Sequence, residues 1–230
     1  VVPDGKRKQL SAGLTPLLSI HNLASFDELA AKLLERQPDL VADVLDAITR
    51  CSSGWNFSED IKKLLHKYIL ARLPENARIW VVGCGRGQLA YSVAMEIANH
   101  ERISGKSNNM QIIASDLPAD DIKSGESGIY SNIQVADLGE DYKRVYLTQV
   151  DGKNWQMKDK VRQRVKFMPA DLTKNFQHLG HMDLIICPDV LVYFSNGVKA
   201  SVLSQFSSLL KPGGILLTGN DQIHLPAVSG

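Results

Sequence analysis

The chain has 230 residues, and its 26 Lys and Arg against 25 Asp and Glu give a formal net charge of +1. This balance argues against binding of a nucleic-acid backbone as the main activity, because proteins of that class usually carry a clear basic excess. Hydrophobic residues make up 44% and charged residues 22%, which is a globular composition and excludes disorder.

The sequence has no apolar run long enough to span a membrane and no signal-peptide pattern, so we expect a cytoplasmic protein without membrane insertion. Cys51, Cys84 and Cys187 lie far apart, which predicts reduced thiols and no metal site. His178 and His181 have no third ligand patterned with them, and we interpret them as surface histidines. Because the chain starts at Val1 and not at Met, we expect it to be a piece of a longer protein.

Residues 1–75 carry helical signals and no strand signal, so we assign them to a helical N-terminal domain. Ser25 precedes two acidic residues and a leucine pattern, which predicts a helix N-cap. Residues 51–56 read as a loop, and residues 60–73 resume a helix that Pro74 ends.

From residue 76 onward, short apolar runs alternate with helical patterns, which is typical of a doubly wound, mostly parallel α/β sheet. The pattern places helices at 89–97 and 198–210, and strands at 78–82, 110–115, 165–168, 182–187 and 215–218. We assign residues 76–230 to this domain. Residues from about 125 to 164 interrupt the alternation with strand-like texture and no clear helix. We interpret them as a small antiparallel β-subdomain inserted in the main sheet.

Five basic residues at the end of this insertion alternate with other residues, so a strand would carry them on one face. They are Lys158, Lys160, Arg162, Arg164 and Lys166. A strand edge guarded by charge is the favoured interpretation, and a contact for an acidic partner surface is the other.

A glycine loop follows the first predicted strand directly, with Gly83, Gly85 and Gly87 ahead of a helix. Glycines suit this position because the chain turns sharply there and a ligand can approach the backbone closely. The dinucleotide fingerprint would require glycine at position 88, where Gln88 stands. A tight turn without a ligand is the alternative.

Asp116 closes the second strand, where a doubly wound sheet presents a carboxylate to ribose hydroxyls, although a helix N-cap would also explain it. Asp171 and Leu172 follow the third strand, where they could contact the edge and the face of an adenine ring. The turn L-K-P-G-G at 210–214 is typical of S-adenosylmethionine-dependent methyltransferases. Together these features favour S-adenosylmethionine as the cofactor.

Four motifs in order now resemble one family, the CheR-type chemotaxis receptor methyltransferases. They are I-W-V-V-G-C-G-R-G-Q-L-A-Y-S-V-A-M at 79–95, A-S-D-L at 114–117, S-G-I-Y-S at 127–131 and D-L-I-I-C-P-D-V-L-V-Y-F at 183–194. The resemblance covers nearly the whole chain, including the helical N-terminal region. It implies methyl transfer to glutamate side chains of chemoreceptors, with the receptor or a similar signalling protein as partner. It also adds Cys84 and Leu117 to the expected cofactor-binding residues.

The sequence departs from the family pattern where the chemistry is expected. Ser58 stands about where the family has an arginine near the transferred methyl, and Gln88 replaces an acid that faces the cofactor. The family's C-R-N becomes C-P-D at 187–189, where Asp189 would restore a negative charge beside the cofactor ammonium. We take Arg50, within the altered segment, and Tyr193, after the fourth strand, as candidate catalytic residues. The alternative function is a degenerate module that binds the cofactor or a signalling partner without methylating it.

Overall fold

The computed structural model describes residues 4–218, except for 42, 45–46, 48–54, 56–58, 189 and 192–193. The chain divides into two compact units, Val1–Gly54 and Trp55–Gly230. This division differs from the predicted boundary at residue 75. The reason is that Trp55, Leu65 and Ile69 are buried in the core cluster of the second unit.

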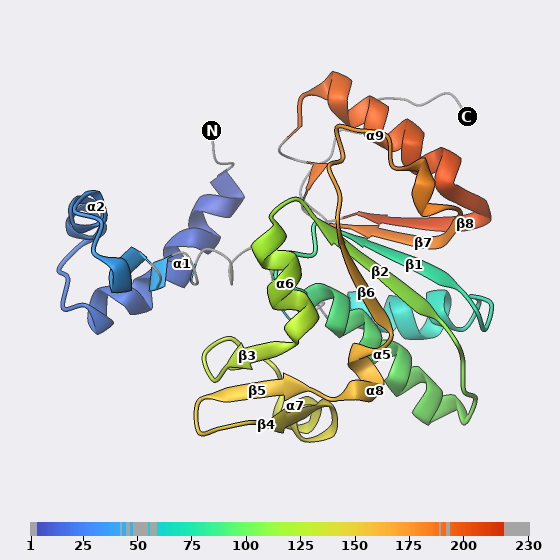
Figure 1. Ribbon diagram of the computed structural model, residues 1–230, viewed down its shortest axis with the longest axis horizontal. Coiled ribbons are helices and arrows are strands. Elements are labelled where there is room, and N and C mark those ends of the chain that lie inside the picture. Colours follow the sequence, from blue (N-terminus) through green and yellow to red (C-terminus); the bar gives the residue numbers. More distant parts are fainter. Residues whose placement is uncertain are drawn as a thin grey trace. The chain divides into compact units, whose positions relative to one another are not determined.

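The first unit contains helices α1 (Asp4–Ile20) and α2 (Phe26–Leu34), both visible in Figure 1. Ser25 caps α2 as the sequence predicts, because its Oγ accepts a hydrogen bond from the Glu28 N–H at 3.2 Å. Glu28 Oε2 in turn accepts the Ala24 N–H at 2.8 Å, so the Ser25 and Glu28 side chains each satisfy one backbone N–H at the start of the helix. The unit has its own small core of buried aliphatic side chains, namely Leu17, Leu23, Leu29, Leu40, Val44 and Ala47.

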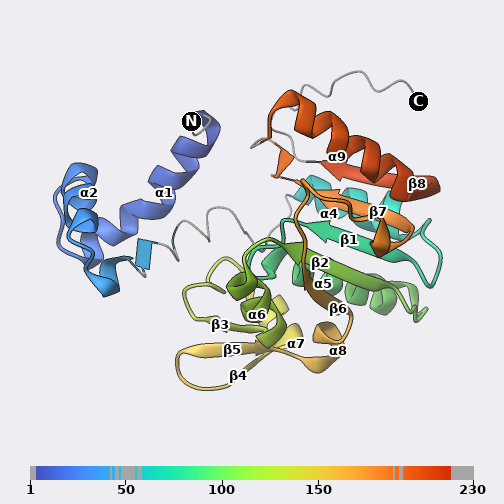
Figure 2. The same ribbon diagram turned by 45° about the horizontal axis from the view of Figure 1, so that its top comes forward.

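The second unit is built on a five-stranded sheet in the order β6-β2-β1-β7-β8, with every neighbouring pair parallel (Figures 1 and 2). The strands are β1 (Arg78–Val82), β2 (Gln111–Asp116), β6 (Val165–Pro169), β7 (Met182–Cys187) and β8 (Leu210–Thr218). The predicted fold class is therefore confirmed. The strand order reverses between β1 and β7, which makes the carboxyl end of β1 the switch point where such sheets bind ligands.

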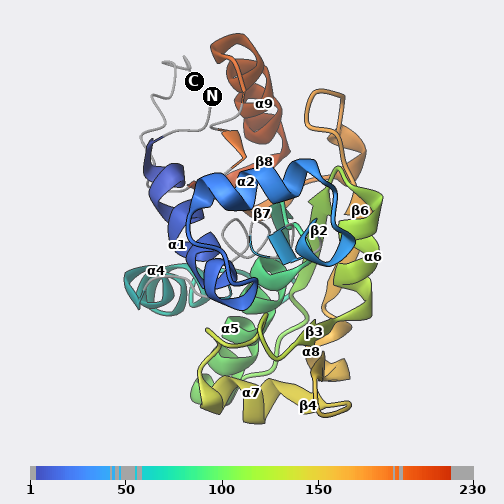
Figure 3. The same ribbon diagram turned by 90° about the vertical axis from the view of Figure 1, so that its left-hand side faces the viewer.

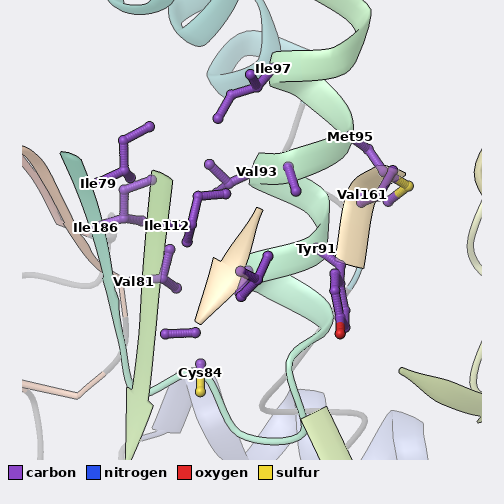
Figure 4. Packing of buried hydrophobic residues seen from close by; sticks show 14 of the residues in the cluster. Ile79, Val81, Cys84, Tyr91, Val93, Met95, Ile97, Ile112, Val161 and Ile186 are labelled. Carbon is purple, nitrogen blue, oxygen red and sulfur yellow. The ribbon is translucent and has the colours of Figure 1, made fainter. Parts of the chain in front are cut away.

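Helices cover both faces of this sheet, as the continuous apolar strands require. On one face α5 (Gln88–Ser104) packs its Val93 and Ile97 against Ile79, Val81 and Ile112 (Figure 4). On the other face α9 (Asn196–Leu209) buries Phe206 against Trp80. The helix α6 (Ala119–Ser127) lies beside β6 at the sheet edge (Figure 3).

The predicted insertion contains a three-stranded antiparallel sheet in the order β3-β5-β4, formed by β3 (Ile129–Ser131), β4 (Leu147–Gln149) and β5 (Asn154–Met157). Two helices that the sequence did not indicate complete it, namely α7 (Glu140–Tyr146) and α8 (Asp159–Arg162). These strands and helices form the β-subdomain.

The basic residues at 158–166 do not share one strand face, so that prediction is wrong. Residues 159–162 form α8, and only residues 165 and 166 of this stretch enter a strand, β6. Arg164 pairs with Glu101, because its Nη2 donates to both carboxylate oxygens at 2.7 Å. Lys158 Nζ donates to the Arg144 and Val145 carbonyls at 2.9 and 2.8 Å. Their alternation in sequence therefore reflects separate local roles.

A buried carboxylate joins the β-subdomain to the rest of the second unit. Glu96 on α5 is 3% exposed; its Oε2 bonds His66 Nε2, and its Oε1 accepts the Tyr142 hydroxyl at 2.8 Å. His66 lies on the π-helix η1 (Leu65–Leu70), which continues α4 (Glu59–Leu64), and Tyr142 lies on α7. The predicted helix at 60–73 thus ends in a π-helix packed on α5.

The turn predicted at 211–214 lies inside β8. The β7–β8 register jumps there, from Met182↔Leu210 to Leu184↔Ile215, and Gly213 adopts a φ of 79°. A short 3-10 helix, η2 (Gln177–Leu179), precedes β7. In the described part of the chain, no helix combines the length and the apolar character that crossing a bilayer requires.

Candidate cofactor-binding site

The loop between β1 and α5 requires its glycines for conformation and for space. Gly83, Gly85 and Gly87 all have positive φ, at 67°, 51° and 94°. A Cβ on Gly83 would lie 2.1 Å from Val190 Cγ2, and one on Gly87 would lie 2.8 Å from Phe167 Cζ. These glycines therefore let the loop pack closely against Val190 and Phe167, and the loop ends at the N-terminus of α5.

The Asp116 side chain is hydrogen-bonded to this loop, although it lies 31 residues after Gly85 in the sequence. Its Oδ2 accepts the Gly85 N–H at 2.7 Å, and its Oδ1 accepts the Leu117 N–H at 2.7 Å. Each carboxylate oxygen has a second lone pair, so Asp116 can accept two further hydrogen bonds. The side chain of Leu117 is 64% exposed, which places an apolar group in solvent next to this carboxylate.

Gln88 begins α5 and is 1% exposed, yet its Oε1 has no hydrogen-bond partner among the described residues. A buried acceptor without a donor costs about 1–3 kcal/mol, so its presence needs an explanation. A ligand that brings a donor to this corner of the loop would supply one.

Cys84 is fully buried in the loop. Burial, and secondarily the negative charge of Asp116, hold the pKa of the Cys84 thiol far above its usual range. The side chain therefore remains a neutral thiol and serves as packing at the end of β1, as Figure 4 shows.

Sequence reasoning did not identify the residues that support the loop from the β-subdomain. The Tyr130 hydroxyl donates to the Arg86 carbonyl at 2.8 Å, and its ring packs edge-on against Trp55, with centroids 4.7 Å apart. Trp55 Nε1 donates to the Gln134 carbonyl at 2.6 Å, and Ser92 Oγ bonds the Trp55 carbonyl. The motif S-G-I-Y-S at 127–131 was the available signal, but it does not reveal the Arg86 contact.

Asp171 and Leu172 follow β6, whose Pro169 pairs with Asp116. Asp171 Oδ1 accepts both the backbone N–H and the hydroxyl of Thr173, at 2.9 and 2.7 Å, and these bonds lower the pKa of Asp171. Leu172 is buried in the core cluster that contains Trp80. Asp171 thus lies near the same sheet edge as Asp116, whereas the Leu172 side chain is part of the core.

The remaining predicted site residues, Arg50, Asp189 and Tyr193, lie outside the described residues, and so does Ser58. The structure brings together Gly83, Cys84, Gly85, Gly87, Gln88, Asp116 and Leu117 at the carboxyl ends of β1 and β2. In the described ranges, no group of three or more His, Cys, Asp or Glu side chains is arranged to hold a metal ion.

Similarity to known proteins agrees with this geometry. Residues 53–225 match the family model described as "CheR methyltransferase, SAM binding domain". The chain is 31% identical to chemotaxis protein methyltransferase 1 of Vibrio cholerae over 225 residues, which cover 95% of this chain and 82% of that protein. It is 30% identical to chemotaxis protein methyltransferase Cher2 of Pseudomonas putida, covering 94% of this chain and 82% of the relative. The matched range includes the glycine loop, Asp116 and the whole β-subdomain.

Proposed function

The chain belongs to the CheR methyltransferase family, and from this premise we propose that it transfers a methyl group from S-adenosylmethionine to glutamate side chains of chemoreceptors. It is an S-adenosylmethionine-dependent methyltransferase of the chemotaxis protein methyltransferase type. The observation that carries the proposal is Asp116, whose carboxylate is bonded to the Gly85 amide and keeps free lone pairs at the switch point of the sheet.

The residues present fit this cofactor. Asp116 would accept the two ribose hydroxyls, and the exposed Leu117 would cover one face of the adenine, with Asp171 toward its edge. Gln88 Oε1, which has no partner within the described ranges, would accept a hydrogen bond from the cofactor's ammonium. The backbone of the glycine loop, which ends at the N-terminus of α5, would lie against the remainder.

The reaction requires the protein mainly to align the cofactor's methyl group with the attacking carboxylate. The cofactor supplies a methyl group on a positively charged sulfur, which is a good leaving group. A glutamate side chain, with an ordinary pKa of about 4.3, is already ionised at neutral pH and needs no general base. Cys84 stays a neutral thiol and does not compete as a nucleophile. The protein therefore holds the two reactants in line, and we propose Arg50 and Tyr193 to orient the substrate carboxylate.

Methyl transfer is tested with tritiated S-adenosylmethionine and the cytoplasmic fragment of a chemoreceptor from the same source. We expect base-labile label in the receptor fragment, and none when the acceptor glutamates are replaced by glutamine. Calorimetric titration with S-adenosylhomocysteine measures cofactor binding separately. Cofactor binding without label in any receptor fragment would contradict the proposal and favour the non-methylating module, which has no specific support from the relatives.

Gln88 offers a separate prediction. Gln88→Leu removes a buried acceptor that has no donor among the residues the structure describes, so we expect the melting temperature of the cofactor-free protein to rise. The same change removes the acceptor for the cofactor ammonium, so we expect affinity for S-adenosylhomocysteine to fall about tenfold. Calorimetry and thermal unfolding measure the two effects on one sample.

Gln88→Glu is the matched control, because it keeps the acceptor and adds the family's charge. Its affinity should equal or exceed that of the original protein. If Asp189 also serves the ammonium, Asp189→Asn should be coupled to position 88 by about 1 kcal/mol. Unchanged affinity in Gln88→Leu would remove this side chain from the cofactor site.

A further inference from the structure

A cavity of about 490 Å³ lies at the far end of α5 from the glycine loop. The last turns of α5, the loop at 105–107 and parts of the β-subdomain around α7 and α8 line it. Arg102, in this wall, is 14 residues from Gln88, which is about 21 Å along the helix axis. The cavity is therefore separate from the proposed cofactor site.

Positive charge dominates the walls of this cavity. Four cationic side chains line it, namely Arg102, Lys106, Lys158 and Lys160, together with one carboxylate, Glu101. Arg164, which is outside the lining, already pairs with that carboxylate, and the Asn108 N–H donates to Glu101 Oε1 at 2.8 Å. Glu101 thus contributes little negative charge to the cavity.

Most of the donors on these cations are available to a ligand. Lys106 and Lys160 have no side-chain hydrogen bond or ion pair with any described residue. Lys158 uses two of its three N–H groups on the carbonyls at the end of α7, which leaves one. The neighbouring carboxylate of Asp159 pairs with Arg162 at 3.3 Å.

Four like charges around one cavity repel one another, and an anion bound among them would relieve that repulsion. The volume falls within the range of small-molecule sites, which is about 300–1,000 Å³. Ala98, Val145 and Val161 give the walls an apolar component, and Val145 is 46% exposed. These features match a compact ligand that combines several negative charges with some apolar surface.

We propose that this cavity binds a small molecule carrying two or more negative charges, on phosphate or carboxylate groups. A small molecule is the occupant we infer, because all four cations line one cavity whose volume is typical of small-molecule sites. The inference does not depend on the proposed methyl transfer, since it uses residues at the opposite end of α5.

Calorimetric titration at constant ionic strength tests the site, with tripolyphosphate as the phosphate probe and citrate as the carboxylate probe. We expect at least one probe to bind saturably. We expect the double variant Lys106→Gln, Lys160→Gln to lose at least about tenfold in affinity for it, because two charge-assisted donors are removed. Lys63→Gln, an exposed lysine on α4, is the matched control and should leave the affinity unchanged.

Affinity for S-adenosylhomocysteine, measured on every variant, verifies that the protein is folded and that the two sites are independent. Amide chemical shifts of residues 105–107 should move on addition of the probe. Saturable binding of neither probe at millimolar concentration would overturn the proposal. So would an equal loss in Lys63→Gln, which would indicate diffuse charge. Binding of polyglutamate alone would assign the cavity to an acidic polypeptide instead.

Discussion

Asp116→Ala is expected to lower the affinity for S-adenosylhomocysteine about 30- to 150-fold, a loss of about 2–3 kcal/mol. Two effects add. The variant loses the acceptors for the ribose hydroxyls, and it also releases the Gly85 N–H, which the carboxylate holds at 2.7 Å. The glycine loop would then lose the hydrogen bond that supports it, and the ligand would lose its principal polar contact with the protein. Calorimetry on the purified variant measures the loss.

Asp116→Asn and Asp171→Asn separate these effects. Asp116→Asn keeps one acceptor oxygen and removes the charge, so its affinity should lie between those of the original protein and Asp116→Ala. Asp171→Asn changes a second proposed cofactor contact, and because Asp171 Oδ1 already accepts two hydrogen bonds from Thr173, its effect should be smaller than that of Asp116→Ala. An affinity of Asp116→Ala equal to that of the original protein would leave Asp116 a structural residue only.

Gly87→Ala is expected to lower the free energy of unfolding by about 3 kcal/mol and to prevent cofactor binding at ordinary concentrations. At a φ of 94° an L-residue is strained by about 1–2 kcal/mol. The added Cβ would also lie 2.8 Å from Phe167 Cζ and 3.1 Å from Gly125 Cα, and such overpacking costs about 1–3 kcal/mol. Urea denaturation measures the stability change.

Two further variants test the cause of this loss. Gly139→Ala is the matched control, because a Cβ there meets nothing within 4 Å and the φ is −54°. In a Phe167→Leu background the ring atoms that crowd position 87 are gone. Gly87→Ala should then cost less, because only the conformational strain of about 1–2 kcal/mol and the contact with Gly125 Cα remain. Equal costs of Gly87→Ala in both backgrounds would show that contact with Phe167 contributes nothing.

The sequence predicts the parallel sheet well because its signals are local. Buried parallel strands read as continuous apolar runs, and each of the five expected strands is present. The helix α7 was missed because seven residues carry too little of the 3.6-residue period to stand out from an alternating pattern. The basic residues at 158–166 show an alternation that no strand produces, since a four-residue helix interrupts it.

The candidate site likewise has some features that the sequence predicts and others that it does not. Placing Gly85 and Asp116 at one sheet edge follows from the direction of parallel strands, and the sequence suffices for that. The hydrogen bond between them depends on the register Val82↔Ser115, which is a tertiary property. That Gln88 Oε1 has no partner in the described part of the chain likewise cannot be predicted from sequence, because it depends on every group packed around the start of α5.

The hydrogen bond from Tyr130 to the Arg86 carbonyl has a consequence for how this fold can be simplified. A shortened enzyme in which a brief connector replaces residues 129–157 would retain all five strands of the parallel sheet. It would lose the hydroxyl that holds the loop and the aromatic ring packed on Trp55. The inserted segment is thus not a detachable module. If a molecule bound to the β-subdomain stabilises this hydrogen-bonded arrangement and thereby raises cofactor affinity, the cofactor raises the affinity of that molecule by the same factor.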